Sequence, residues 1–177
     1  MKIKSPHHII VLFLISLLLT ACNGVENSEN NTKIVDYQQQ KESVEKANRY
    51  LVAKESEDIN DYIERRGLDF ERTGTGLAYC ILNHGRGLQI KRNEVISIEY
   101  EVRLLTGDVL YSSKQDGIKT FTVSKGGVES GLEEAVSYMR HGDVAEVVIP
   151  SHLAHGLIGD GNKVPPRATL IYKIKIL

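Results

Sequence analysis

The sequence predicts an α+β fold in which an antiparallel sheet of five to six strands wraps around one short helix and follows an N-terminal helical segment. The 177 residues are 41% apolar and 25% charged, which excludes collagen-like and wholly disordered chains. Residues 36–66 contain no Pro or Gly and carry apolar side chains at roughly helical spacing. After Gly74 and Gly76 the sequence changes to short runs that are typical of strands, with one helical pattern among them.

Residues 1–21 have the features of a signal peptide, with a basic start and an apolar stretch over residues 9–19. That stretch is too short to span a bilayer comfortably. It leads into Leu19-Thr20-Ala21-Cys22, which resembles the lipobox of bacterial lipoproteins, where cleavage precedes a lipidated cysteine. We therefore expect Cys22 to be a lipidation site and the first residue of the mature chain. The alternative is an ordinary secretory signal whose removal leaves a free cysteine.

Removal of residues 1–21 would take away two lysines and no acidic residue, which changes the net charge from −1 to −3. This balance argues against nucleic-acid binding. Acyl chains on Cys22 would hold the protein on a membrane, since each buried CH₂ contributes about 0.8 kcal/mol. With Cys22 lipidated, only Cys80 remains, so no internal disulfide is expected. Cys80 is expected to be a small buried hydrophobe.

Two segments are expected between the signal peptide and the strands. Residues 22–35 are rich in Asn, Glu and Ser, and we interpret them as a flexible tether from the lipidated cysteine. Residues 36–67 form a helical segment, with a break near Ser56 as one alternative and Gly67 as its stop. The apolar stripe needs a partner, which is either the following domain or a second copy of the chain in a homodimer. Its members are Val44, Ala47, Leu51, Ile59, Tyr62 and Ile63.

The domain that follows, residues 74–177, contains six β-like runs and one short helix. Alternation gives each run an apolar face to bury, and Gly107-Asp108 between two runs predicts a hairpin turn. In the helix, Ser130 and Glu133 have the spacing of a capping box, and Gly142 is expected to end the helix. The helix has an apolar stripe of Leu132, Ala135, Val136 and Met139. The six runs are residues 77–82, 95–105, 109–111, 120–123, 144–149 and 168–176.

Laid out in order, residues 74–177 resemble the FK506-binding-protein (FKBP) family of peptidyl-prolyl cis-trans isomerases. Several local motifs match in sequence and in order, and chance is unlikely to supply all of them together. They are Tyr100, Gly107-Asp108, Ser112-Ser113, Val128, Gly131-Leu132-Glu133-Glu134, Ile149-Pro150, Ala154-His155-Gly156, Val164-Pro165-Pro166 and Ala168-Thr169-Leu170.

The resemblance implies an FKBP-like fold and the isomerisation of X-Pro bonds in proline-containing polypeptides. That reaction must overcome a barrier of about 18 to 20 kcal/mol, and an apolar pocket that favours the twisted amide lowers it without metal or cofactor. By the same resemblance, the catalytic positions are Tyr100, Tyr111 and His155. The substrate-binding positions are Leu110, Val128, Glu129, Leu132, Val164 and Tyr172.

Several of these positions depart from the family's usual pattern. Leu132 stands where many members have the Trp that floors the pocket, Leu110 replaces Phe, and Tyr111 replaces Asp. His155 replaces a Tyr whose hydroxyl meets the bound peptide, so we expect an imidazole N–H to donate instead. Glu129 replaces an apolar residue and brings a charge to the rim. The pocket is expected to remain apolar with fewer aromatic planes.

His152 and His155 are spaced as a pair of metal ligands, but no carboxylate or thiolate accompanies them, so no metal site is expected. We interpret their surroundings as a Gly-rich flap that carries binding residues, because Gly156, Gly159 and Gly161 precede Pro165-Pro166.

The expected function is that of a lipid-anchored isomerase for exported proteins, which faces the periplasm at the bacterial envelope. The alternative is a catalytically weak FKBP-like chaperone or assembly module of an envelope machine for gliding or secretion. The alternative of weak catalysis is based on the aromatic residues that the expected pocket lacks. The alternative of an assembly module is based on the combination of lipobox, helix and domain, which resembles gliding-motility-associated lipoprotein isomerases.

Overall fold

The computed structural model describes residues 26–177, with side chains from residue 37 onward. The predicted signal peptide and Cys22 lie outside these residues and stay predictions. The chain divides after Leu51 into two compact units, the second of which is Val52–Leu177. Helix α2 (Glu26–Arg66) contributes residues to both units. Within residues 26–177, no helix is long and apolar enough to cross a membrane.

Helix α2 confirms the predicted helical segment and passes through Ser56 without a break. It also includes residues 26–35, where the sequence predicts a tether. The reason is that no Gly or Pro follows Gly24 until Gly67, and extending a formed helix costs much less than starting one. At its C-terminal end, the Gly67 N–H donates to the carbonyls of Ile63 and Glu64 at 3.2 Å each, which closes the last turn.

One antiparallel sheet of seven strands forms the body of the second unit, with the order β1-β2-β6-β7-β3-β4 and β5 paired to β3. The six predicted runs are all strands. The seventh strand, β1, was missed because its two residues are both exposed and show no alternation. The strands are β1 (Glu71–Arg72), β2 (Ala78–Asn83), β3 (Val95–Leu104), β4 (Val109–Ser112), β5 (Lys119–Thr122), β6 (Val144–Ile149) and β7 (Leu170–Ile176).

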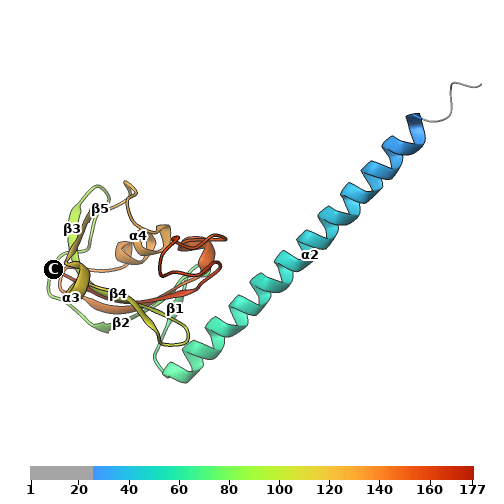
Figure 1. Ribbon diagram of the computed structural model, residues 1–177. Coiled ribbons are helices and arrows are strands. Elements are labelled where there is room, and N and C mark those ends of the chain that lie inside the picture. The colour runs from blue at the N-terminus through green and yellow to red at the C-terminus, as the bar shows by residue number, and fades with distance from the viewer. Residues whose placement is uncertain (1–25) are drawn as a thin grey trace, which may run out of the picture. The chain divides into compact units, whose positions relative to one another are not determined.

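Helix α4 (Ser130–Ser137) fills the concave side of the sheet, which curves around it in Figure 1. Leu132, Ala135 and Val136 are completely buried in the main core. Gly131 permits this approach, because a Cβ there would lie 2.3 Å from the Cγ2 atom of Ile149. The short helix α3 (Ser113–Asp116) and the 3₁₀ helix η1 (Ser151–Leu153) complete the unit.

The predicted capping box of α4 is wrong. The Ser130 hydroxyl donates to the Leu153 carbonyl at 3.2 Å, and the Glu133 carboxylate accepts from the N–H groups of Lys125 and Gly126. The loops before and after the helix thus supply partners that replace the local capping bonds. The helix also ends at Ser137, earlier than the predicted stop at Gly142.

The opposite face of the sheet carries a second, smaller core. Ile59 of α2 is 3% exposed and packs with Ala78, Val148 and Ile171. Tyr62 and Ile63 lie partly buried against the same cluster. The C-terminal part of the α2 stripe therefore has the following domain as its partner, whereas Val44 and Leu51 are exposed.

Candidate active site

A cavity of about 350 Å³ opens on the concave side of the sheet, among residues from four strands, α3 and two loops. One of these loops is the flap, residues 150–169 between β6 and β7, which contributes His155 and Asp160. The lining residues are Tyr100, Val102, Tyr111, Asp116, Lys119, Glu129, His155, Asp160 and Tyr172.

Strand register builds the floor of this cavity. Val102 of β3 lies directly opposite Tyr111 of β4 and Tyr172 of β7, so three side chains form a row across neighbouring strands. Tyr100 is two residues before Val102 on the same face of β3. Val102 and Tyr172 are each only 1% exposed, so the floor is held in place by the core.

A carboxylate network occupies one wall of the cavity. Glu129 Oε1 accepts a hydrogen bond from the Tyr172 hydroxyl at 2.6 Å and, with a proton on Nε2, from His155 at 3.2 Å. Glu129 Oε2 is buried and has no hydrogen-bond partner in the part of the chain that the structure describes. The Lys119 ammonium lies 4.0 Å from this oxygen. One oxygen of a nearly buried carboxylate is therefore left without a direct donor.

Charge and burial compete at this wall. Burial raises the pKa of Glu129, but the Tyr172 hydrogen bond and the Lys119 charge outweigh it, so the net pKa is lowered. Burial first, and then the Glu129 charge, raises the pKa of Tyr172 well above its usual range. At neutral pH the wall therefore combines an ionised glutamate with a neutral tyrosine.

The opposite wall is built around Asp160 in the flap. Asp160 accepts a short hydrogen bond from the Tyr111 hydroxyl, and its other oxygen accepts the N–H groups of Asn162 and Val164 at 2.8 Å each. Burial raises the pKa of Asp160, but these three bonds outweigh it and lower the pKa to about 2. Asp160 thus connects the tip of the flap to the sheet in its ionised form.

Comparison with known proteins identifies the domain that carries this cavity. Residues 87–177, just over half of the chain, match the family of FKBP-type peptidyl-prolyl cis-trans isomerases. The chain belongs to this family. An FKBP-type peptidyl-prolyl cis-trans isomerase of Neisseria meningitidis, FkpA, is 39% identical over 106 residues, which are 59% of this chain and 38% of that protein.

Two further relatives agree with the FKBP assignment. The outer membrane protein MIP of Legionella longbeachae is 31% identical over 158 residues, or 81% of this chain and 67% of that protein. The crystal structure of AtFKBP13 superimposes with a TM-score of 0.59 at 28% identity, covering 60% of this chain and 95% of that one. The chain thus spans well under half of the Neisseria protein and two thirds of the Legionella protein.

The structure brings five of the predicted FKBP site residues together around the cavity: Tyr100, Tyr111, Glu129, His155 and Tyr172. The other four predicted site residues lie elsewhere. Leu110, Leu132 and Val164 are buried in the main core, and Val128 packs partly buried against it. Leu132 is 0% exposed and packs in the main core, and it is not among the residues that line this cavity, so its place in the site stays a prediction.

Sequence reasoning missed four residues of the cavity, namely Val102, Asp116, Lys119 and Asp160. Alternation along β5 could have indicated Lys119, since it shares a face with the buried Phe121. The expected apolar character also differs from the structure, because Asp116, Lys119, Glu129, His155 and Asp160 make five of the nine lining residues acidic or basic.

Metal ligation has no support in the geometry of the described side chains. His152 Nε2 contacts the Thr75 carbonyl at 3.0 Å, while His155 contacts Glu129, so the two imidazoles serve different partners. Among these residues, no group of three or more His, Cys, Asp or Glu side chains could hold a metal ion.

Cys80 is a buried free thiol whose pKa is raised by burial.

Proposed function

We propose that this chain catalyses cis-trans isomerisation of X-Pro bonds in polypeptides, with the concave cavity as its active site. The observation that carries the proposal is the row of Tyr172, Val102 and partly buried Tyr111 beside Tyr100, in a domain that the isomerase family model matches. Tyr111 and Tyr100 would offer aromatic surface to a pyrrolidine ring, and the almost fully covered Val102 and Tyr172 hold this floor in place. The volume of the cavity, about 350 Å³, suits a proline side chain with its flanking peptide groups.

The chemistry requires no bond to be made or broken, because only the resonance of one amide is lost in the transition state. That loss accounts for the barrier of about 18 to 20 kcal/mol. A proline ring seated on Tyr100 and Tyr172 would exclude water from the planar amide, and water stabilises the planar form. Rotation about the C–N bond can then proceed while the ring stays in place.

His155 would act at the polar edge of the bound amide. Its Nε2 atom is hydrogen-bonded to Glu129, so a peptide that keeps this contact meets the imidazole through Nδ1. In the neutral ring Nδ1 accepts a hydrogen bond, and in the imidazolium it donates one. Glu129 thereby selects which nitrogen is offered to the peptide, a role that the sequence alone did not suggest.

The direct experiment measures exchange between the cis and trans forms of a short X-Pro peptide by NMR, with and without the full chain. We expect isomerisation to become faster in proportion to protein concentration, and a Tyr172→Ala variant that stays folded to lose most of this effect. A rate equal to that of the peptide alone would contradict the proposal.

A second candidate function is supported by the charged lining of the cavity. Ionised Glu129 and Asp160 are poorly suited to an apolar ring, and the side chain at Leu132 is withdrawn into the core. These features favour an FKBP-like chaperone or assembly module that binds proline-containing segments with little catalysis. Binding of the same peptide without faster isomerisation would support this function over the first.

The location that we propose is the bacterial envelope, facing the periplasm, with exported polypeptides as substrates and a lipid on Cys22 as the anchor. The lipobox-like sequence before Cys22 supports the anchor. A homodimer through residues 36–66 is part of the same proposal, since Tyr37, Val44 and Tyr50 of α2 are more than half exposed. Incorporation of labelled fatty acid at Cys22, and sedimentation of the chain, test the two parts.

A further inference from the structure

A glutamate of helix α2 binds both ends of the flap. Glu55 Oε1 accepts hydrogen bonds from the Ser151 N–H and from the Thr169 hydroxyl, each at 2.6 Å. Glu55 Oε2 accepts a third hydrogen bond, from the Ser151 hydroxyl, at 3.0 Å. Ser151 and Thr169 are 8% and 5% exposed, so these bonds form where water has little access.

The two residues that Glu55 contacts lie at opposite ends of the flap. The flap begins after β6 ends at Ile149 and finishes before β7 starts at Leu170. Ser151 is therefore its second residue and Thr169 its last. One carboxylate group joins the two ends of a loop of twenty residues, and that loop carries His155 and Asp160 into the cavity.

Backbone hydrogen bonds continue the connection from Glu55 to the active site. The Ser151 carbonyl accepts the N–H of Gly156 at 2.8 Å, next to His155. The Gly156 carbonyl in turn accepts the N–H of Arg167 at 2.8 Å, and Arg167 lies two residues before Thr169. The chain of contacts thus runs from Glu55 through Ser151, Gly156 and Arg167 back to the second end of the flap, beside His155.

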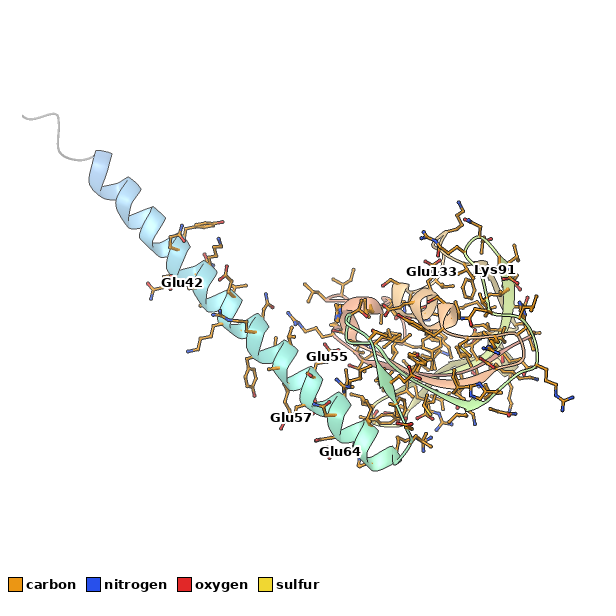
Figure 2. The ribbon with its side chains drawn as sticks, turned by 180° about the vertical axis from the view of Figure 1, so that it is seen from behind. Glu42, Glu55, Glu57, Glu64, Lys91 and Glu133 are labelled. Atoms are coloured by element: carbon orange, nitrogen blue, oxygen red, sulfur yellow. The ribbon has the colours of Figure 1, made fainter. Side chains whose placement is uncertain are left out.

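Glu57, two residues further along α2, provides a contrast. It pairs with Lys54 on the same helix at 3.1 Å, and its side chain is 65% exposed. Figure 2 shows Glu55 on the side of α2 that faces the sheet domain and Glu57 on the other side. The flap contacts therefore belong to one glutamate position and are not a general property of an acidic helix.

We infer that Glu55 is a positioning residue, which holds His155 in the active site by clamping Ser151 and Thr169 at the two ends of the flap. This inference rests on the proposed isomerase function. It assigns to α2 a part in substrate binding: without the carboxylate, three donors at the base of the flap lose their acceptor and the loop separates from the helix. His155 would then move relative to Tyr100 and Tyr172, which stay fixed in the sheet.

The test compares Glu55→Gln with the matched control Glu57→Gln in the full chain. The amide keeps the size of the side chain, but it removes the negative charge and replaces one of the two acceptor oxygens of the clamp with an NH₂ group. Hydrogen exchange is followed by NMR at the amides of Gly156 and Arg167, with the amides of β7 as the internal reference. We expect exchange of the two flap amides to become about tenfold faster in Glu55→Gln, with β7 unchanged.

Activity gives the second readout. Because the flap acts through binding of the peptide, KM for an X-Pro peptide should rise about fivefold in Glu55→Gln while kcat stays within about twofold. Glu57→Gln should match the unaltered protein in both measurements. If Glu55→Gln does not fold, Thr169→Val removes one hydroxyl donor from the clamp, and we expect the same changes at smaller size.

The outcomes separate the two proposals. Faster exchange that is confined to the flap, together with the rise in KM, supports the clamp. Equal acceleration across flap and β7 would show a general loss of stability and overturn it, as would unchanged flap exchange. If the unaltered protein does not accelerate cis-trans isomerisation of the X-Pro peptide, the isomerase function is overturned. The hydrogen-exchange measurement would still decide whether Glu55 holds the flap.

Discussion

The two faces of the sheet each hold a glutamate that accepts a hydrogen bond from a tyrosine hydroxyl, and the two glutamates differ in how their carboxylate oxygens are paired. On the outer face, Glu146 accepts from Tyr62 at 2.9 Å and from Arg66, whose Nε and Nη2 atoms meet one oxygen each at 2.7 Å. On the concave face, Glu129 accepts from Tyr172 and His155 through one oxygen, and its other oxygen has only Lys119 at 4.0 Å.

The two glutamates differ in how completely their carboxylates are paired. Glu146 is 5% exposed, and both of its oxygens are satisfied by a bidentate arginine, so the charge is neutralised where it is buried. Glu129 keeps its charge beside the cavity with incomplete pairing, which costs stability and fits the role in the site that we propose for it. The outer face also has a cavity, of about 300 Å³, but the Glu146 and Arg66 side chains that line it neutralise one another.

The largest expected effect comes from breaking the pair on the outer face. Arg66→Ala leaves Glu146 buried with a tyrosine as its remaining close donor, and we expect the free energy of unfolding to fall by about 2 to 3 kcal/mol. This is below the cost of a fully buried pair because the Arg66 side chain is 41% exposed. Urea denaturation measures it, with Arg65→Ala at the neighbouring exposed position as the control. A loss equal to that of the control would show that the pair contributes nothing.

The Arg66–Glu146 pair should also make the free energy of unfolding depend on pH. Burial raises the pKa of Glu146, but the Arg66 and Tyr62 hydrogen bonds outweigh burial, and the net pKa lies below the ordinary 4.5. A carboxyl with a lowered folded pKa contributes stability above its unfolded pKa, and this contribution disappears as the pH falls through the folded value. We therefore expect Glu146→Gln to be less stable than the unaltered protein near neutral pH, and the two to converge below about pH 4.5.

Unfolding free energies of both proteins between about pH 7 and pH 3 provide the measurement. Parallel curves over this range would contradict the assignment of the lowered pKa to Glu146. Glu57→Gln again serves as the control for the loss of one exposed carboxylate.

The smallest expected effect lies on the concave face, at His155. His155→Phe removes one of the two hydrogen-bond donors to Glu129 Oε1 and the imidazole edge that the peptide would meet. We expect peptide affinity to fall several-fold, corresponding to about 0.5 to 1.5 kcal/mol, with little change in stability. Titration with an X-Pro peptide measures it. His152→Phe, in the same flap but outside the cavity, should leave affinity unchanged, and equal affinities for both variants would exclude His155 from the site.

Local patterns in the sequence were sufficient for most of the fold. Alternation predicted six of the seven strands, and the stripe of Leu132, Ala135 and Val136 predicted the helix that the sheet covers. These predictions succeed because a strand or helix must bury one face, and the period of that face is written in consecutive residues. The motifs of the FKBP family are local in the same sense, which is why they could be recognised without a structure.

The charged interactions around the site were decided by tertiary structure alone. Glu55 meets Thr169 across 114 positions of sequence, Arg66 meets Glu146 across 80, and Glu129 meets Tyr172 across 43. The predicted capping box was wrong for the same reason, because the fold brings the Leu153 carbonyl to the Ser130 hydroxyl. A carboxylate can be satisfied by any donor that the fold brings within about 3 Å, and the sequence carries no period for such meetings. Which acids stabilise the sheet and which face the cavity is therefore determined only when the loops and helix α2 pack against the strands.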